Sequence, residues 1–246
     1  MSSKTGLAAL AACVSFACNS PSGPSEAEAP GIYATAQEGT VLVRIDPSSG
    51  SATVVGPLNQ SGAFALAERA DGALFTITDS GFVANPNARV ATVDRRTGGA
   101  TAFGQPFGEY LRMMGLAFDR DGTLYASSPI TQSLYRIDLA TGRPVAIGPF
   151  GVNGIMDLAF DGAGNLWANT QTALYRVDRA TGAATLAARV TGAAMLMGIT
   201  FAPDGRLFAT TYEAESMLYR VDPESGVATM VGTTGIGFVH SAEFSR

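Results

Sequence analysis

Residues 175–182 read Tyr-Arg-Val-Asp-Arg-Ala-Thr-Gly, and this stretch decides the fold because close copies of it occur four more times. Neighbouring copies are separated by 40 to 48 residues, measured between their aspartates, Asp46, Asp94, Asp138, Asp178 and Asp222. Repeats of about 40–45 residues are typical of the four-stranded blades of β-propellers. The sequence therefore predicts a ring of similar small sheets.

A second motif precedes four of the five copies. It reads Leu-Ala-Phe-Asp-Arg-Asp-Gly-Thr-Leu-Tyr at residues 116–125, and related versions occupy residues 66–75, 158–167 and 199–208. Its Asp-Gly pair supplies the positive φ that a tight hairpin needs. Each unit is thus predicted to contain four strands: A (Leu-Ala-Phe type), B (Leu-Tyr-Ala type), C (Leu-Tyr-Arg-Val type) and D, which follows the Thr-Gly turn.

The first copy lacks a strand A of its own. Residues 31–35 match strand B, and the missing strand A lies at the other end of the chain, in residues 239–244. We therefore predict an all-β fold for residues 31–246, a five-bladed β-propeller with four antiparallel strands per blade. Its last blade would be closed by one C-terminal strand A plus three N-terminal strands, which leaves no open end between the first and last blades.

The start of the chain is typical of a targeting segment. Lys4 precedes an apolar run at residues 6–17 that is too short to span a membrane. Residues 18–30 are rich in Ser, Pro and Glu, which predicts a disordered tether. A signal segment that ends at a cysteine resembles those of bacterial lipoproteins, in which that cysteine carries the lipid.

This resemblance implies a signal peptide at residues 1–17, a tether at 18–30 and lipidation of Cys18. Cys13 is an alternative lipidation site, and a plain secreted protein cut nearby is another reading. We expect secretion across the inner membrane, anchoring at the outer membrane or cell surface, and membrane contact only through the N-terminal lipid.

Composition excludes several classes of function. The chain has 16 Lys and Arg against 21 Asp and Glu, and no basic run that could hold a phosphate backbone, so nucleic acid is not an expected partner. Both cysteines lie in the targeting segment, which excludes disulfides and cysteine-based zinc sites from the body. We expect a monomer that needs no cofactor.

The repeats resemble those of uncharacterised bacterial propellers and of the broader NHL, gluconolactonase and streptogramin-lyase superfamily, across residues 31–246. The resemblance implies the fold. Gluconolactonase relatives have six blades and an axial metal held by Glu, Asn and Asp, whereas streptogramin-lyase relatives have seven blades and a catalytic histidine. Neither the blade number nor the residues match here, so no catalytic residue is carried over.

The repeated aspartates are interpreted as structural. An aspartate four residues before a glycine can accept hydrogen bonds from the backbone of its own turn, and five equivalent copies indicate architecture. The stretches that begin at Asp119 and Asp161 faintly resemble calcium loops. They lack the later bidentate carboxylate, so hairpin turns explain them better.

Alignment of the five strands A places one set of side chains at a common level around the axis: Phe64, Met114, Met156, Met197 and His240. The next position holds small residues and one charge: Ala65, Gly115, Asp157, Gly198 and Ser241. Packing between blades is the favoured role of the first set. Met114, Met156, Met197 and His240 could alternatively bind Cu(I), and Asp157 with His240 could form an acid–base pair.

The loops at the same end contribute aromatic and polar side chains that could surround a ligand. With the axial residues they give six candidate binding residues: Asp157, His240, Arg112, Tyr110, Tyr212 and Asn153. Phe82 and Phe107 lie in the same loops. The leading hypothesis is an envelope-anchored, non-catalytic binding or scaffold module for a glycan, peptide or protein. The alternatives are a propeller enzyme (lyase, lactonase or glycan-active) with its site at the axial mouth, and a copper-binding protein.

Overall fold

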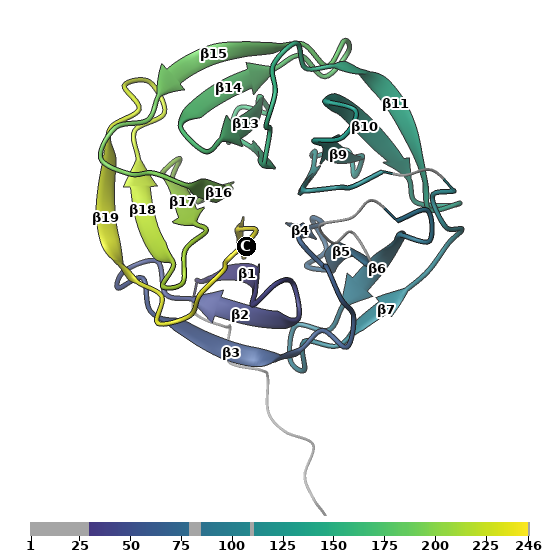
Figure 1. Cartoon of the computed structure of the whole chain (residues 1–246), viewed down its shortest axis with the longest axis horizontal. Helices are drawn as coiled ribbons and strands as arrows, with labels where there is room; N and C mark the ends of the chain where they lie inside the picture. The colour runs from purple at the N-terminus through teal and green to yellow at the C-terminus, as the bar shows by residue number, and fades with distance from the viewer. Residues whose placement is uncertain (1–29, 79–84, 109–110, 246) are drawn as a thin grey trace, which may run out of the picture.

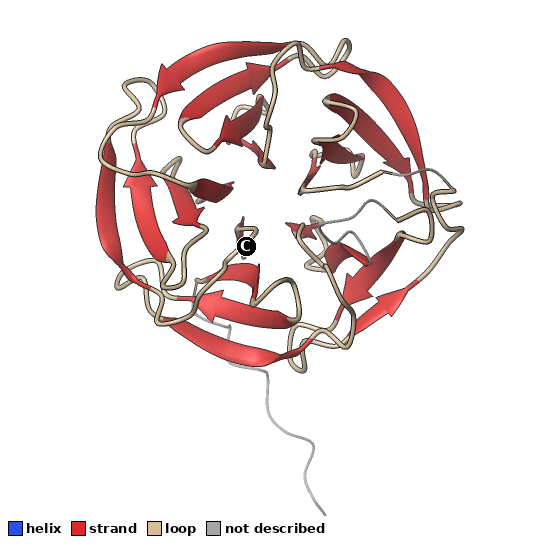
Figure 2. Ribbon diagram, viewed as in Figure 1, coloured by secondary structure: helices blue, strands red, loops and turns tan. Residues whose placement is uncertain are grey.

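The computed structural model describes residues 30–78, 85–108 and 111–245. Five sheets of four antiparallel strands surround a central axis (Figure 1), which confirms the predicted all-β, five-bladed propeller. These ranges contain strands and loops but no helix (Figure 2), and hence no helix that could cross a membrane. The predicted signal peptide, Cys13, Cys18 and the tether up to residue 29 lie outside the described residues.

Each blade runs from an inner strand A to an outer strand D. Blade 1 contains β4 (Ala67–Glu68), β5 (Leu74–Thr78), β6 (Arg89–Val93) and β7 (Ala100–Ala102). Blade 2 contains β8 (Gly115–Phe118), β9 (Leu124–Ser128), β10 (Ser133–Asp138) and β11 (Arg143–Pro149). Blade 3 contains β12 (Asp157–Phe160), β13 (Leu166–Thr170), β14 (Ala173–Val177) and β15 (Ala184–Arg189). Blade 4 contains β16 (Leu196–Phe201), β17 (Leu207–Thr211), β18 (Met217–Val221) and β19 (Ala228–Thr233).

Blade 5 joins the two ends of the described chain. It consists of β20 (Glu243–Phe244), β1 (Ile32–Ala36), β2 (Val41–Ile45) and β3 (Ala52–Pro57), with Phe244 opposite Ile32. In Figure 1 the C-terminus lies beside β1, on the inner side of the ring. The His240 amide also donates to the carbonyl of Thr35 at 2.9 Å. The predicted closure by one C-terminal strand and three N-terminal strands is confirmed.

The repeated aspartates cap the turns between strands C and D. In every blade the aspartate accepts the N–H of the residue two positions later, for example Ser48 onto Asp46 at 2.8 Å and Ala180 onto Asp178 at 2.8 Å. Hydrogen bonds from these turns hold the pKa of all five carboxyl groups below its ordinary value. Asp119 and Asp161 likewise accept N–H groups of their own hairpins. The structural interpretation of both motifs is confirmed.

Aromatic pairs connect neighbouring blades. At four seams, the phenylalanine that ends strand A packs against the aromatic residue of strand B in the preceding blade. The pairs, with their ring-centroid distances, are Phe118–Phe75 (5.1 Å), Phe160–Tyr125 (5.7 Å), Phe201–Trp167 (5.7 Å) and Phe244–Phe208 (6.1 Å). Such pairs contribute about 0.5–1.5 kcal/mol beyond the area that they bury.

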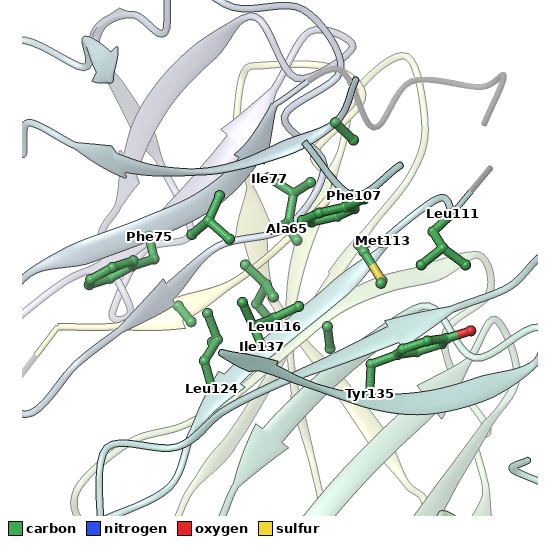
Figure 3. Close-up of a cluster of buried hydrophobic side chains, with 14 of the residues drawn as sticks. Ala65, Phe75, Ile77, Phe107, Leu111, Met113, Leu116, Leu124, Tyr135 and Ile137 are labelled. Atoms are coloured by element: carbon green, nitrogen blue, oxygen red, sulfur yellow. The ribbon is translucent and has the colours of Figure 1, made fainter. Parts of the chain in front are cut away.

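The core fills the seams between the blades. Figure 3 shows one part of it, where Phe75 and Ile77 of β5 face Leu116 of β8 and Ile137 of β10. Phe107 belongs to the same cluster and is only 4% exposed, so this loop residue packs into the core. The propeller is thus held together by apolar contact between blades.

Small residues bring the inner strands close together at the axis. A Cβ atom on Gly115 would lie 2.7 Å from the Cα of Asp157, which no real side chain tolerates, so glycine is required there. Asp157 itself is 1% exposed. This crowding agrees with the small residues predicted at this level.

Candidate functional site

The two ends of the propeller differ in the loops that they carry. Strands A begin at one end, next to His240, and we call this the histidine end. They finish at the Asp-Gly hairpins of the opposite end, which we call the hairpin end. The candidate site that the sequence predicted lies at the histidine end.

His240 is enclosed by aromatic rings. Its imidazole stacks on Phe64 with ring centroids 4.1 Å apart and an interplanar angle of 26°, and the Tyr212 ring lies 4.8 Å away. Only 1% of His240 is exposed. Burial lowers the pKa of the imidazole to about 3, and the positive charge of Arg112 contributes. His240 is therefore neutral at physiological pH.

The predicted methionines gather at the same place. Met114 and Met197 form a buried cluster with Phe64, and the partly buried Met156 and Tyr212 pack against it. No group of three or more His, Cys, Asp and Glu side chains that could hold a metal occurs within the described ranges. The apolar cluster forms a platform under the loops, and copper binding by Met114, Met156, Met197 and His240 stays a hypothesis.

Glu38 is a component of this site that sequence reasoning missed. Its Oε1 accepts a hydrogen bond from the Tyr212 hydroxyl at 2.9 Å, and its Oε2 lies 3.6 Å from His240 Nε2. Burial, together with this hydrogen bond, raises the pKa of Tyr212 to about 12. The Arg112 guanidinium lies 5.7 Å from the Phe64 ring centroid. A carboxylate, a phenol and a guanidinium thus surround the aromatic platform.

Asp157 has a different environment from His240. Its carboxylate accepts the N–H groups of Leu158 at 2.9 Å and Ile199 at 3.1 Å, and the backbone of Ala242 and Leu116 adds further hydrogen bonds. Burial raises its pKa well above the ordinary value despite these bonds. Asp157 therefore connects the inner strands of several blades.

The remaining candidates lie apart from this cluster. Asn153 is exposed in the loop that precedes β12. Tyr110 and Phe82 fall outside the described residues. The structure therefore brings together His240, Tyr212 and Arg112 of the six predicted binding residues and adds Glu38.

Backbone strain is concentrated at the histidine end. Met195 (φ 55°) and Phe238 (φ 57°) adopt the left-handed conformation two residues before the axial level, where Gly62 and Gly154 stand in other blades. Non-glycine residues adopt this region at a cost of about 1–3 kcal/mol, and such residues tend to cluster at functional sites. Both side chains are exposed, Met195 at 37% and Phe238 at 36%. Two large apolar residues at a position aligned with glycines would have been a usable sequence signal.

The turn that carries Glu38 is strained as well. Gln37 (φ 50°) and Glu38 (φ 61°) are both left-handed and precede a left-handed Gly39. This conformation turns Glu38 towards Tyr212 and His240. Beside it, the Phe238 ring lies 5.2 Å from the Tyr212 ring. Exposed aromatic surface and charged groups thus meet around one point of the histidine end.

Comparison with known proteins identifies a repeat family and a fold. Residues 31–156 match the family described as "Repeat of unknown function (DUF6923)". No curated protein matches the chain. Among solved structures, the nidogen/laminin complex has a similar chain (TM-score 0.60, 11% identity, 88% of this chain and 98% of that chain covered).

Two further structures show the same fold. One is a structural genomics protein of unknown function from Bacteroides thetaiotaomicron (TM-score 0.60, 15% identity, 88% of this chain and 65% of that chain covered). The other is a streptogramin B lyase (TM-score 0.50, 16% identity, 83% of this chain and 65% of that chain covered). The present chain spans less than two thirds of either protein. At these identities the three neighbours establish the fold alone.

Proposed function

Since the chain belongs to the family of the "Repeat of unknown function (DUF6923)", whose description names no activity, we propose its function from the histidine end. We propose a non-catalytic recognition module that binds a glycan on the surface formed by Met195, Tyr212 and Phe238. Glu38 and Arg112 would hydrogen-bond the sugar hydroxyls. An aromatic face beside a few convergent polar groups is a common arrangement for binding sugars.

The strained backbone of Met195 and Phe238 carries this proposal. A glycine at either position would adopt the left-handed conformation without strain, as Gly62 and Gly154 do in other blades. The chain instead keeps two large apolar side chains there and leaves each more than a third exposed. A cost in stability without a gain in burial is expected where a side chain contacts a ligand.

The contacts of the axial groups favour binding over catalysis. The Asp157 carboxylate accepts backbone N–H groups of the inner strands, and the neutral His240 imidazole lies between Phe64 and Tyr212. We assign both groups to the support of the surface above them. The proposal also includes the envelope location: a lipid on Cys18 and the tether of residues 18–30 would hold the propeller at the outer membrane or cell surface.

A glycan and peptidoglycan-fragment array probed with the purified chain tests this function. The expected result is saturable binding of at least one glycan that Tyr212→Ala and Phe238→Ala each weaken. Val145→Ala serves as the matched control, because Val145 is an exposed apolar residue (45%) on the outer strand β11. The absence of any bound glycan, or equal loss in the control, would overturn the proposal.

A further inference from the structure

A cavity of about 620 Å³ lies at the hairpin end, opposite the proposed glycan surface. Its walls come from the hairpins of blades 2, 3 and 4, together with the turn between strands C and D of blade 3. The phenylalanines that end three neighbouring strands A line it: Phe118, Phe160 and Phe201. Phe160 and Phe201 are only partly buried, so their rings are accessible from the cavity.

The charged groups of this cavity carry an excess of negative charge. Its lining has three aspartates (Asp119, Asp121 and Asp161) against two arginines (Arg120 and Arg179), a formal difference of one negative charge. Both arginines have partners: Arg179 pairs with Asp119 at 3.3 Å, and Arg120 donates to the carbonyl of Gly162. The cavity therefore favours a cation over an anion.

Two carboxylates of the lining, Asp121 and Asp161, are not paired with an arginine within the described ranges, although Asp161 accepts hydrogen bonds from its own hairpin. Asp121 is exposed and makes no ion pair within the part of the chain that the structure describes. Burial alone would raise the pKa of Asp161, but hydrogen bonds from Trp167 Nε1 and Asn165 lower it below its ordinary value. Asp161 is thus a fixed negative charge in the lining of the cavity.

Within the described residues, five arginines lie over an aromatic ring while they pair with a carboxylate, and two of them illustrate the pattern. Arg179 lies over the Phe160 ring, 5.7 Å from its centroid, while it pairs with Asp119. At the seam between blades 5 and 1, Arg95 lies 4.9 Å from the Tyr33 ring centroid and pairs with Glu68 at 3.3 Å. Aromatic faces next to carboxylates at this end of the propeller thus hold organic cations, and the cavity offers the same chemistry to a ligand.

We propose that the hairpin-end cavity is a second binding site, for a small organic cation of the quaternary or methylated ammonium class. The cation would contact the faces of Phe160 and Phe201 and lie near Asp121 and Asp161. Aromatic rings attract such cations through the negative charge on their faces. This site is at the opposite end from Tyr212 and Phe238, so it is independent of the proposed glycan surface.

The proposal is tested by titrating the purified chain with choline and with tetramethylammonium. Calorimetry and changes in NMR chemical shift measure the binding. The matched probe is the neutral isostere of choline in which a tert-butyl group replaces the trimethylammonium group. We expect saturable binding of both cations and no comparable binding of the neutral probe. Equal affinity for the neutral probe, or the absence of saturable binding at millimolar cation, overturns the proposal.

Three variants locate the binding site. Phe160→Leu keeps the apolar volume and removes the aromatic face, which should raise the Kd by about threefold to thirtyfold. Asp121→Asn should raise it by about twofold to fivefold at low salt, with a smaller effect at high salt. Arg179→Met removes the internal guanidinium over Phe160 and should lower the Kd.

The control is Asp204→Asn, at the corresponding hairpin of blade 4. Asp204 is exposed and pairs with Arg206 at 2.7 Å, and it does not line the cavity. Unchanged binding in this control supports the assignment. Wild-type affinity in Phe160→Leu, or weaker binding in Arg179→Met when that variant is folded by circular dichroism, contradicts it.

Discussion

Ile32 and Phe244 lie directly opposite each other in the closing blade, although they come from the two ends of the described chain. This pairing involves few residues, since β20 consists only of Glu243 and Phe244. So short an inner strand needs further contacts to hold it in the ring, and Arg95 of blade 1 contacts Ser245, which follows β20, and Tyr33 of the neighbouring β1.

Arg95 connects the closing blade to blade 1. It pairs with Glu68 at 3.3 Å, donates to the carbonyl of Gly72 at 3.1 Å and to the Ser245 hydroxyl, and lies over the Tyr33 ring. We predict that Arg95→Met lowers the free energy of unfolding by about 2–3 kcal/mol, because it takes a cationic partner from a Glu68 side chain that is only 3% exposed.

Urea denaturation measures this effect. Arg176→Met is the matched control, because Arg176 also lies over an aromatic ring but pairs with Glu224 at the surface. Surface pairs contribute about 0–1 kcal/mol. If Arg95→Met costs no more than the control, Arg95 does not hold the closing seam together.

The buried Asp157 predicts an unusual dependence of stability on pH. Its pKa is raised in the folded protein, so the folded state holds a proton that the unfolded chain releases above 3.8. The stability from this proton is complete below pH 3.8 and is lost as the pH rises towards the folded-state pKa. Asp157→Asn replaces one acceptor oxygen with a donor and should destabilise by about 1–3 kcal/mol in acid. We expect that cost to shrink as the pH rises.

Thermal unfolding of the wild type and of Asp157→Asn, from below pH 3.8 upwards, checks the prediction. Asp222→Asn is the control with the opposite sign, because hydrogen bonds from its turn lower the pKa of the exposed Asp222 carboxyl. The loss of stability caused by Asp222→Asn should appear above pH 3.8 and vanish as the pH falls. A cost of Asp157→Asn that grows with pH would show that the buried carboxyl is ionised.

The buried His240 predicts that stability falls as the pH becomes mildly acidic, which is the reverse of the trend expected from Asp157. Its pKa falls from 6.5 in the unfolded chain to about 3 in the folded protein, so the unfolded chain binds more protons between these values. Stability from the neutral imidazole is therefore present above 6.5 and lost on acidification, by up to about 1.4 kcal/mol per pH unit.

His240→Phe keeps an aromatic ring against Phe64 and removes the titrating group. We expect the variant to gain stability relative to the wild type as the pH falls from about 7 to about 5, a range above the ordinary titration of carboxyl groups. Calorimetric unfolding at several pH values measures this difference. Parallel pH profiles for the two proteins would contradict the buried, neutral imidazole.

The fold was predictable because its signals are local and repeated. Each hairpin needs a left-handed residue, and Gly122 and Gly205 mark two of them at the same place in the repeat. Each turn between strands C and D needs an acceptor such as Asp178, four residues before a glycine. The closure also followed from the sequence, because residues 239–244 match a strand A that the first repeat lacks.

The candidate site was only partly predictable, because its contacts join distant loops. Glu38 follows β1 and reaches Tyr212 of blade 4 and His240 of the C-terminal segment. No repeat pattern marks such a contact, since it depends on how one strained turn directs one side chain. The hairpin-end cavity was missed for a similar reason: Phe160 and Asp161 occupy repeat positions that are typical of packing and of turns.

The strained residues of the histidine end predict a separation of stability from binding. Met195→Gly and Phe238→Gly should leave stability unchanged or raise it by up to about 1 kcal/mol, because glycine adopts the left-handed backbone without a steric cost. The same substitutions remove apolar side chains that the proposed glycan contacts, so they should weaken its binding severalfold.

Met230→Gly is the control, because Met230 is exposed (49%) within β19, where glycine costs stability and leaves binding intact. Denaturation and glycan titration of the three variants measure both quantities. Loss of stability in Met195→Gly and Phe238→Gly with unchanged glycan affinity would mean that these side chains serve the fold and not the ligand.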